Sequence, residues 1–260
     1  MDGSIILETK NLRKEFGALV AVDDVNLRVR VNTVHSIIGP NGAGKTTLFN
    51  LLSNAFEPTT GKVFFQGKSI THLPMHRIIH LGIGRSYQIT NLFPNLTVLE
   101  NVRLAAQALG KDSFRFLQAA GYFKRYEKRA WEVLNQVGLA DRAQVLARTL
   151  PHGDQRKLEL AIILAPDPKL LLLDEPTAGM AAEQVPGMIN LIGQIKNTGN
   201  KTIILVEHNM SVVMNISDLI TVMHQGRILA EGTPSEISAN PEVQSAYLGK
   251  LYSDLAGKEA

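Results

Sequence analysis

Eight residues near the start of the chain constrain its fold more than any other feature. They read Gly39-Pro40-Asn41-Gly42-Ala43-Gly44-Lys45-Thr46 and fit the pattern G-x-x-x-x-G-K-[ST]. The strand-like segment Val34 to Ile38 precedes them, and the helical run Thr47 to Ser53 follows. A glycine-rich turn between a strand and a helix directs backbone N–H groups and a helix N-terminus toward one point, which suits a polyphosphate. A glycine turn without this function would match the pattern by chance in roughly one chain in a hundred.

The sequence therefore predicts a phosphate-binding loop, in which Lys45 reaches the terminal phosphates and the Thr46 hydroxyl ligates Mg²⁺. Such a site also needs a carboxylate for the metal. The run Leu170 to Leu173 is typical of a buried parallel strand, and Asp174 and Glu175 follow it directly. We expect Asp174 to hold Mg²⁺ and Glu175 to orient or deprotonate the water that attacks the γ-phosphate. The alternative is a pair of solvated acids at a strand end.

Strand and helix signals alternate along the chain and predict an α/β fold. The strand-like segments of the first 70 residues are Ile5 to Glu8, Val25 to Val29, Val34 to Ile38 and Val63 to Gln66. From Thr97, which has capping-box spacing to Glu100, to about Thr149 the sequence is mostly helical. Strand signals resume at Thr202 to Val206 and at a hairpin of Leu219 to Met223 with Arg227 to Ala230, and Thr233-Pro234-Ser235-Glu236 starts a last helix.

Composition excludes several kinds of protein. The formal net charge is only +3, from 27 basic and 24 acidic residues, so the charge balance indicates no nucleic-acid partner. The chain has no cysteine, which excludes a disulfide framework, a thiol nucleophile and a thiolate metal site. The start Met1-Asp2-Gly3-Ser4 is acidic where a secretory signal is basic, and no apolar run reaches the roughly 18 residues of a membrane span. We expect a soluble, cytoplasmic chain.

Three further segments narrow the choice among phosphate-loop NTPases. They are Arg85-Ser86-Tyr87-Gln88, the segment Leu150-Pro151-His152-Gly153-Asp154-Gln155-Arg156, and His208 after the strand Thr202 to Val206. In this order and spacing they resemble the ATP-binding subunits of ABC transporters over essentially the whole chain. The resemblance implies a single domain, 1–260, with a mixed-sheet core, an amino-terminal antiparallel β subdomain and an inserted α-helical subdomain. The core would comprise residues 1–88 and 165–260, and the helical subdomain residues 89–164.

The resemblance also implies roles for single residues. Phe16 would stack on adenine, with a core or strand phenylalanine as the alternative. Gln88 would sense Mg²⁺ and the attacking water and couple them to a membrane partner. His208 would bond the γ-phosphate and support Glu175. The implied catalytic set is Glu175, His208 and Gln88; the metal set is Thr46, Gln88 and Asp174; and the ATP-binding set is Phe16, Gly39, Pro40, Asn41, Gly42, Ala43, Gly44, Lys45, Thr46, Thr47, Gly153 and Asp154.

The segment from Leu150 departs from the family signature L-S-G-G-Q at three positions. Pro151 replaces the serine, His152 the first glycine and Asp154 the glutamine. In the family this signature reaches across a dimer to the γ-phosphate of the other subunit, and Pro151 supplies neither a hydroxyl nor an N–H for that contact. Backbone N–H groups from Gly153 onward, and the His152 side chain, remain as donors. The following loop, Pro176 to Met180, lacks the aspartate that crosses the dimer interface in the family.

Three local features are similar to the ATP-binding subunits of branched-chain amino-acid importers. They are Gly82 to Gln88, the insert Gly121-Tyr122-Phe123 with the basic stretch Lys124 to Arg129, and the ending from Glu231-Gly232-Thr233-Pro234 to Tyr247-Leu248-Gly249. Importers of urea and short amides share much of this pattern and stay open as an alternative. The basic stretch would lie near anionic lipid or form a solvated helix face.

The resemblance implies a set of partners. Two membrane permease subunits, fed by an external substrate-binding protein, would receive two such chains as a homodimer or a heterodimer on the inner face of the cell membrane. A groove between the Gln88 loop and the helical block would take a short helix of the permease. A DNA-repair ATPase with the same head is a rival, but its long coiled coil is missing from the 105 residues between Lys45 and Leu150. We expect ATP and Mg²⁺ as cofactors and no nucleic acid.

Overall fold

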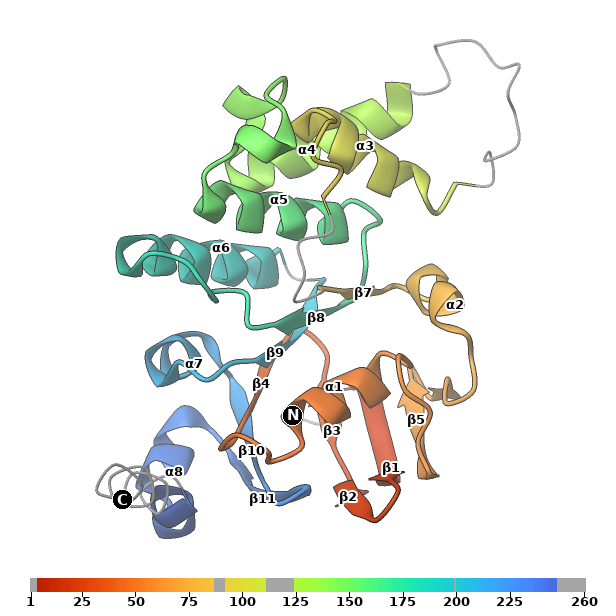
Figure 1. The fold of residues 1–260 in the computed structure, drawn as a ribbon, viewed down its shortest axis with the longest axis vertical. Helices are drawn as coiled ribbons and strands as arrows, with labels where there is room; N and C mark the ends of the chain where they lie inside the picture. Colours follow the sequence, from red (N-terminus) through yellow and green to blue (C-terminus); the bar gives the residue numbers. More distant parts are fainter. Residues whose placement is uncertain (1–3, 87–91, 111–123, 199, 247–260) are drawn as a thin grey trace. The chain divides into compact units, whose positions relative to one another are not determined.

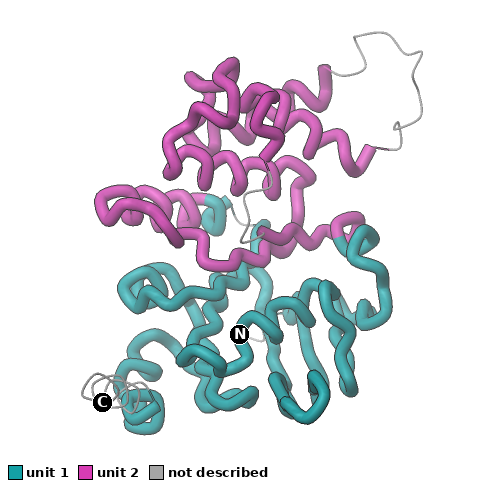
Figure 2. The backbone as a smooth tube through the Cα atoms, viewed as in Figure 1, with its two compact units in different colours: residues 1–78, 195–260 teal, residues 79–194 magenta. Residues whose placement is uncertain are grey.

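The computed structural model describes residues 4–86, 92–110, 124–198 and 200–246. The chain divides into two compact units (Figure 2). The first unit comprises residues 1–78 and 195–260, and the second comprises residues 79–194. Among the described residues, no helix is long and apolar enough to cross a membrane.

The first unit contains an antiparallel sheet made almost entirely from the start of the chain (Figure 1). Its strands are β1 (Ile5–Phe16), β2 (Leu19–Val25), β3 (Arg28–Arg30), β5 (Thr60–Phe65) and β6 (Lys68–Ser69). They lie in the order β2-β1-β5-β6, and β3 pairs with β1. The amino-terminal antiparallel sheet of the expected fold is thus confirmed.

The expected strand Val25 to Val29 is wrong in its bounds. The chain leaves β2 at Val25 and enters β3 only at Arg28. Asp24 has φ of 51°, in the left-handed region, and the N–H of Leu27 donates to the Thr9 hydroxyl at 2.8 Å. A side chain thus takes the place of a ladder acceptor, so the extended run is interrupted between β2 and β3.

A mixed sheet completes the first unit. Its strands β4 (Val34–Ile38), β9 (Thr202–Val206), β10 (Leu219–His224) and β11 (Arg227–Gly232) lie in the order β11-β10-β4-β9. The pairs β10–β4 and β4–β9 are parallel, whereas β10 and β11 form the predicted antiparallel hairpin. Every residue of β4 and β9 is buried, including His35 and Ser36 of β4, as expected for parallel strands covered on both faces.

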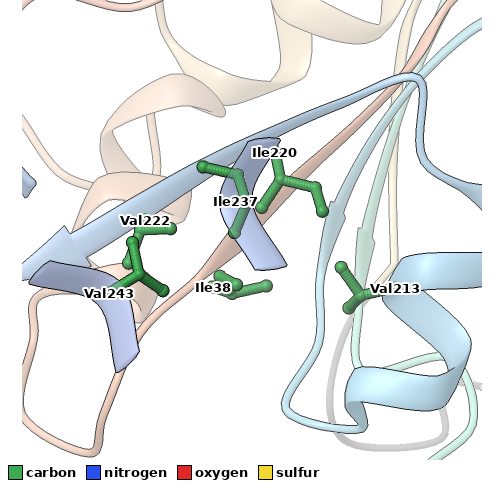
Figure 3. Packing of buried hydrophobic residues seen from close by; sticks show 6 residues of the cluster. All are labelled: Ile38, Val213, Ile220, Val222, Ile237 and Val243. Carbon is green, nitrogen blue, oxygen red and sulfur yellow. The ribbon is translucent and has the colours of Figure 1, made fainter. Parts of the chain in front are cut away.

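Helices α1 (Lys45–Leu52), α7 (Met210–Ile216) and α8 (Pro234–Ala239) lie in this unit. Thr233 and Glu236 form the expected capping box at α8, with Pro234 in the first turn. Figure 3 shows Ile237 of α8 and Val213 of α7 beside Ile38, Ile220 and Val222 of the sheet, with Val243 of the segment after α8. This buried cluster anchors α8 and the segment after it to β4, the strand that leads into the phosphate-binding loop.

The second unit combines two short strands with the helical block. Helix α2 (Met75–His80) leads into it, and β7 (Ile83–Arg85) pairs in parallel with β8 (Leu170–Asp174). The helices are α3 (Val98–Gln107), α4 (Lys124–Val137), α5 (His152–Leu164) and α6 (Val185–Asn197), the last of which ends in the first unit. Thr97 and Glu100 form the predicted capping box of α3. Single 3-10 turns cover Ala140–Arg142, Ala147–Thr149 and Ala182–Gln184.

The basic stretch at the start of α4 has two kinds of members. Lys124, Arg125 and Lys128 are exposed. Arg129 instead donates to the carbonyls of Leu164 and Ala165, at 3.0 and 3.2 Å, where α5 ends. A cation at the C-terminus of a helix satisfies carbonyls that lack partners within the helix. Arg129 is therefore a structural residue, and the Arg125 guanidinium donates to the Tyr126 hydroxyl at 2.5 Å.

Candidate functional site

The loop Gly39 to Thr46 joins β4 to α1, as its sequence context predicted. Two of its glycines could not be another residue without a change of backbone. A Cβ on Gly39 would lie 2.3 Å from the Met223 carbonyl oxygen, and one on Gly44 would lie 2.3 Å from the Ala21 carbonyl oxygen. Gly44 is the N-cap of α1 with φ of 97°, a value that favours glycine. The loop is thus pressed between the two sheets of the first unit.

The N-terminus of α1 has the features of an anion-binding site. Its first turn, Lys45-Thr46-Thr47, carries no acidic side chain, and Gly44 has no side chain with which to cap the helix. The first N–H groups of a helix lack partners within the helix, and the helix dipole adds positive potential there. The Lys45 ammonium donates to the carbonyls of Gly39 and Pro40, at 2.7 and 3.0 Å. These contacts hold the cation over the loop.

A cavity of about 840 Å³ opens beside the first half of this loop. It is lined by Pro40, Asn41, Gly42 and Ala43, by the turn His224-Gln225, and by residues at the end of the described chain. Lys45 and Thr46 are not among the described residues that line it. The cavity therefore flanks the predicted phosphate seat and does not coincide with it.

The acid pair lies at the end of β8 in the second unit. Asp174 is 6% exposed, and its N–H donates to the Ser86 hydroxyl at 2.8 Å. The N–H of Ser86 donates in turn to the Leu172 carbonyl at 2.8 Å, so the chain after β7 is fixed beside the end of β8. Gln88 follows two residues later and lies outside the described residues. Glu175 has φ of 47°, the left-handed conformation that is costly for a residue with a side chain.

His208 follows β9 and is exposed. The strand is parallel to β4, so its end and the phosphate-binding loop lie at the same edge of the mixed sheet. Sequence reasoning missed Glu207, which is 1% exposed and whose carboxylate accepts from the N–H groups of His208 and Asn209, at 3.2 and 3.4 Å. An acidic residue between a buried strand and an Asn N-cap was the available signal. Glu207 shapes the turn that presents His208.

Phe16 ends β1 and is 44% exposed, so it is not a core residue. Its ring meets that of Phe56 edge to face, with ring centroids 5.7 Å apart. The Lys14 ammonium lies 5.1 Å from the centroid of the Phe16 ring. Such contacts hold an exposed ring in place. Phe56 and Lys14 were not foreseen because nothing in their local sequence marks them.

The segment that resembles the signature forms the start of α5. Pro151 is the N-cap, and Gly153 is buried. The Asp154 carboxylate is paired with Arg142 at 2.9 Å and with Lys157 at 3.2 Å. The N–H of Asp154 donates to the Pro151 carbonyl at 3.0 Å. In this conformation both groups of Asp154 are engaged within the second unit.

A groove of about 460 Å³ lies within the second unit. Its walls come from the end of β7, from α3 and from α5, and are mostly apolar; they include Ile79, Phe93, Leu104, Ile162 and Ile163, with Arg85, Ser86, Asn101 and Glu159 among the polar members. Phe93 and Ile79 are 57% and 41% exposed. The Gln88 loop, which the sequence analysis expected to form one wall of a groove, lies outside the described residues.

Comparisons with known proteins match the chain at the level of the family. Residues 22–178 match the family described as ABC transporter. Residues 227–251 match the family described as branched-chain amino acid ATP-binding cassette transporter. The first match covers more than half of the chain, and the second covers the region of β11 and α8.

Individual proteins agree with these matches. The chain is 42% identical over 250 residues to the high-affinity branched-chain amino acid transport ATP-binding protein BraF of Pseudomonas aeruginosa, covering 94% of this chain and 98% of that protein. It resembles the crystal structure of an ATP-binding cassette of an ABC transporter in its ADP conformation, with a TM-score of 0.81, 29% identity, and coverage of 95% and 99% of the two chains. A dimeric bacterial ABC transporter cassette matches with a TM-score of 0.75, 26% identity, and coverage of 88% and 99%. The α/β fold with its antiparallel subdomain is thus confirmed.

Proposed function

The chain belongs to the ABC transporter family, and from this membership we propose that it is the ATP-hydrolysing subunit of an importer of branched-chain or other hydrophobic amino acids. ATP binding and hydrolysis follow from the family. The main support for the proposed substrate class is the match of residues 227–251 to the branched-chain amino acid cassettes. That region lies outside the ABC transporter match, so it adds evidence that the general family match does not contain. The 42% identity to a relative named for branched-chain amino acid transport supports the same conclusion.

The phosphate-binding loop holds the triphosphate in this proposal. Backbone N–H groups of Gly39 to Thr47 and the Lys45 ammonium contact the phosphates, and the exposed ring of Phe16 stacks on adenine. Gly153 and Asp154 serve the nucleotide of a second chain, as a homodimer or with a related subunit. The whole chain acts as one ATPase domain, with residues 1–88 and 165–260 as the core and residues 89–164 as the helical subdomain.

The residues proposed for Mg²⁺ fit that ion. Thr46 offers a hydroxyl, Asp174 a carboxylate and Gln88 an amide oxygen, and oxygen donors are what Mg²⁺ prefers. Asp174 is well placed to be a ligand because Ser86 fixes its backbone at the end of β8. When bound, Mg²⁺ would neutralise charge on the phosphates.

Catalysis then depends on groups that this chain supplies. The Glu175 carboxylate takes a proton from the water that attacks the γ-phosphate, and its left-handed backbone turns the chain sharply after β8. His208, presented by the turn that Glu207 holds, donates to the γ-phosphate oxygens, where negative charge must be stabilised. Gln88 links this chemistry to the groove.

The groove of the second unit is the proposed docking site of a permease. Its apolar walls and the exposed Phe93 suit a short amphipathic helix. Two such chains beneath two permease subunits, fed by an external binding protein, would place this protein at the inner face of the membrane.

Uptake by living cells tests the proposal. Cells that lack the gene should take up radiolabelled leucine at a rate reduced at least tenfold. The wild-type chain and the Glu183→Gln control, altered at an exposed acid of the second unit, should restore uptake, whereas Glu175→Gln should not. Unchanged leucine uptake together with reduced urea uptake would replace the amino-acid assignment with that of a urea or short-amide importer.

A further inference from the structure

An ion pair on α5 connects two features of the second unit. The Arg156 guanidinium and the Glu159 carboxylate lie 2.8 Å apart, three residues along one helix face. Their side chains are only 13% and 15% exposed. Most ion pairs of this spacing lie on solvated helix faces and contribute little. Removing one member of a largely buried pair costs much more stability, because the charge of the remaining member is left buried without compensation.

Arg156 also holds the loop that follows Glu175, the proposed base. Its second terminal nitrogen, Nη2, donates to the carbonyl of Ala178 at 3.3 Å. The N–H of Ala178 donates to the carbonyl of Glu175 at 3.0 Å, which closes a turn over Glu175 to Ala178. Because Glu175 is in a left-handed conformation, the direction of its side chain depends on how this turn is held.

Glu159 faces the other feature, the groove. It is one of the groove's few charged lining residues, and Ser86, which fixes the Asp174 N–H, lines the same groove. A second, small cavity of about 20 Å³ is bordered by Arg156, Glu159, Ser86, Asp174 and Pro176. The pair is therefore packed between the groove and the end of β8.

The two charged groups have few other contacts. The Nε atom of Arg156 and the Oε1 atom of Glu159 are buried, and neither finds a hydrogen-bond partner within the described part of the chain. Each charge is compensated chiefly by the other, so removing one releases the other from its position.

We propose that Arg156 and Glu159 are positioning residues for ATP hydrolysis, which hold the turn Glu175 to Ala178 so that the Glu175 carboxylate meets the attacking water. The inference rests on the proposed role of Glu175. Neither residue touches the nucleotide in this proposal: Arg156 acts on the turn through the Ala178 carbonyl, and Glu159 fixes the guanidinium of Arg156.

Steady-state ATP hydrolysis by the purified full chain tests the inference. Arg156→Ala and Glu159→Gln should each lower kcat about tenfold and leave KM and the Kd for ATP within about twofold, since the nucleotide contacts are intact. Arg156→Lys, which keeps the charge but offers a single donor nitrogen, should recover part of the loss. The double variant should be no slower than Arg156→Ala alone, because both changes remove the same Arg156–Glu159 ion pair. Glu132→Gln removes the acid of a comparable but more exposed pair, Arg129–Glu132 at 3.5 Å, and should leave kcat unchanged.

Melting temperature and the stoichiometry of ATP binding, measured on the same samples, separate positioning from folding. A loss of turnover that vanishes when activity is expressed per nucleotide-binding site would overturn the inference, and so would wild-type kcat in Arg156→Ala. Glu175→Gln, assayed in parallel, separates two failures. If that variant keeps full turnover, the proposed base is wrong; if it is inactive while Arg156→Ala is unaffected, only the positioning role fails.

Discussion

The imidazole Nε2 of His35 lies 2.7 Å from the hydroxyl oxygen of Thr221, inside the mixed sheet of the first unit. The Thr221 hydroxyl donates to the Glu231 carboxylate at 2.8 Å, so its oxygen accepts a hydrogen bond from the Nε2–H group of His35. His35 is fully buried on β4, and burial lowers its pKa from 6.5 to about 4. The folded chain therefore keeps this histidine neutral where an unfolded chain would protonate it.

This neutrality predicts a loss of stability in acid. The pKa of His35 is lower in the folded than in the unfolded chain, so the unfolded state binds the extra proton below pH 6.5, and the free energy of unfolding falls as pH decreases toward 4. Between about pH 7.5 and about pH 5 the loss from this residue should be roughly 2 kcal/mol. Urea unfolding at several pH values measures it. His35→Gln should flatten the dependence, whereas His76→Gln, at an exposed site, should preserve it.

Gly44→Ala should abolish ATP binding and destabilise the fold. The new Cβ would meet the Ala21 carbonyl oxygen at 2.3 Å, and the φ of 97° is strained for alanine. Equilibrium binding of a fluorescent ATP analogue and thermal unfolding measure the two effects. Gly193→Ala is the matched control: a Cβ there meets no described atom within 4 Å, and in the interior of α6 the change should be neutral or stabilise by about 0.5–1 kcal/mol. A Gly44→Ala protein that binds ATP normally would contradict the loop assignment.

Glu175→Gln should trap an ATP-bound dimer and lower turnover at least tenfold. The amide keeps the size of the side chain but cannot accept the proton of the attacking water. Size-exclusion chromatography with ATP and Mg²⁺, and phosphate release, measure the two outcomes. Unchanged phosphate release from a folded variant would remove Glu175 from the role of base.

Phe16→Ala should weaken ATP affinity roughly three- to tenfold, because one stacking contact contributes about 0.5–1.5 kcal/mol beyond buried area. Phe16→Tyr keeps the ring and should bind ATP within about twofold of the wild type. Calorimetric titration with ATP and with inorganic triphosphate separates base from phosphate recognition. Equal weakening for both ligands would argue against adenine stacking.

Local patterns carried most of what the sequence could predict. The capping boxes at Thr97 and Thr233 involve residues three apart, and both form as expected. The buried strand at 202–206 follows from a nearly continuous apolar run, and the phosphate-binding loop follows from its position between a strand and a helix.

What depends on distant partners was not predictable. The break between β2 and β3 comes from the Thr9 hydroxyl, 18 residues from Leu27. The positioning role of Arg156 depends on its hydrogen bond to Ala178, 22 residues away. The ring of Phe16 is held by Phe56, 40 residues away. No pattern within a short window of sequence could reveal these contacts.

The hydrogen bonds from Arg129 to the last carbonyls of α5 also affect the dynamics of the two helices. One guanidinium joins the middle of α4 to the end of α5, so neither helix can unravel there without releasing the other. Amide protons of the two helices should then exchange with solvent deuterium as one cooperative group, and Arg129→Ala should divide that group in two.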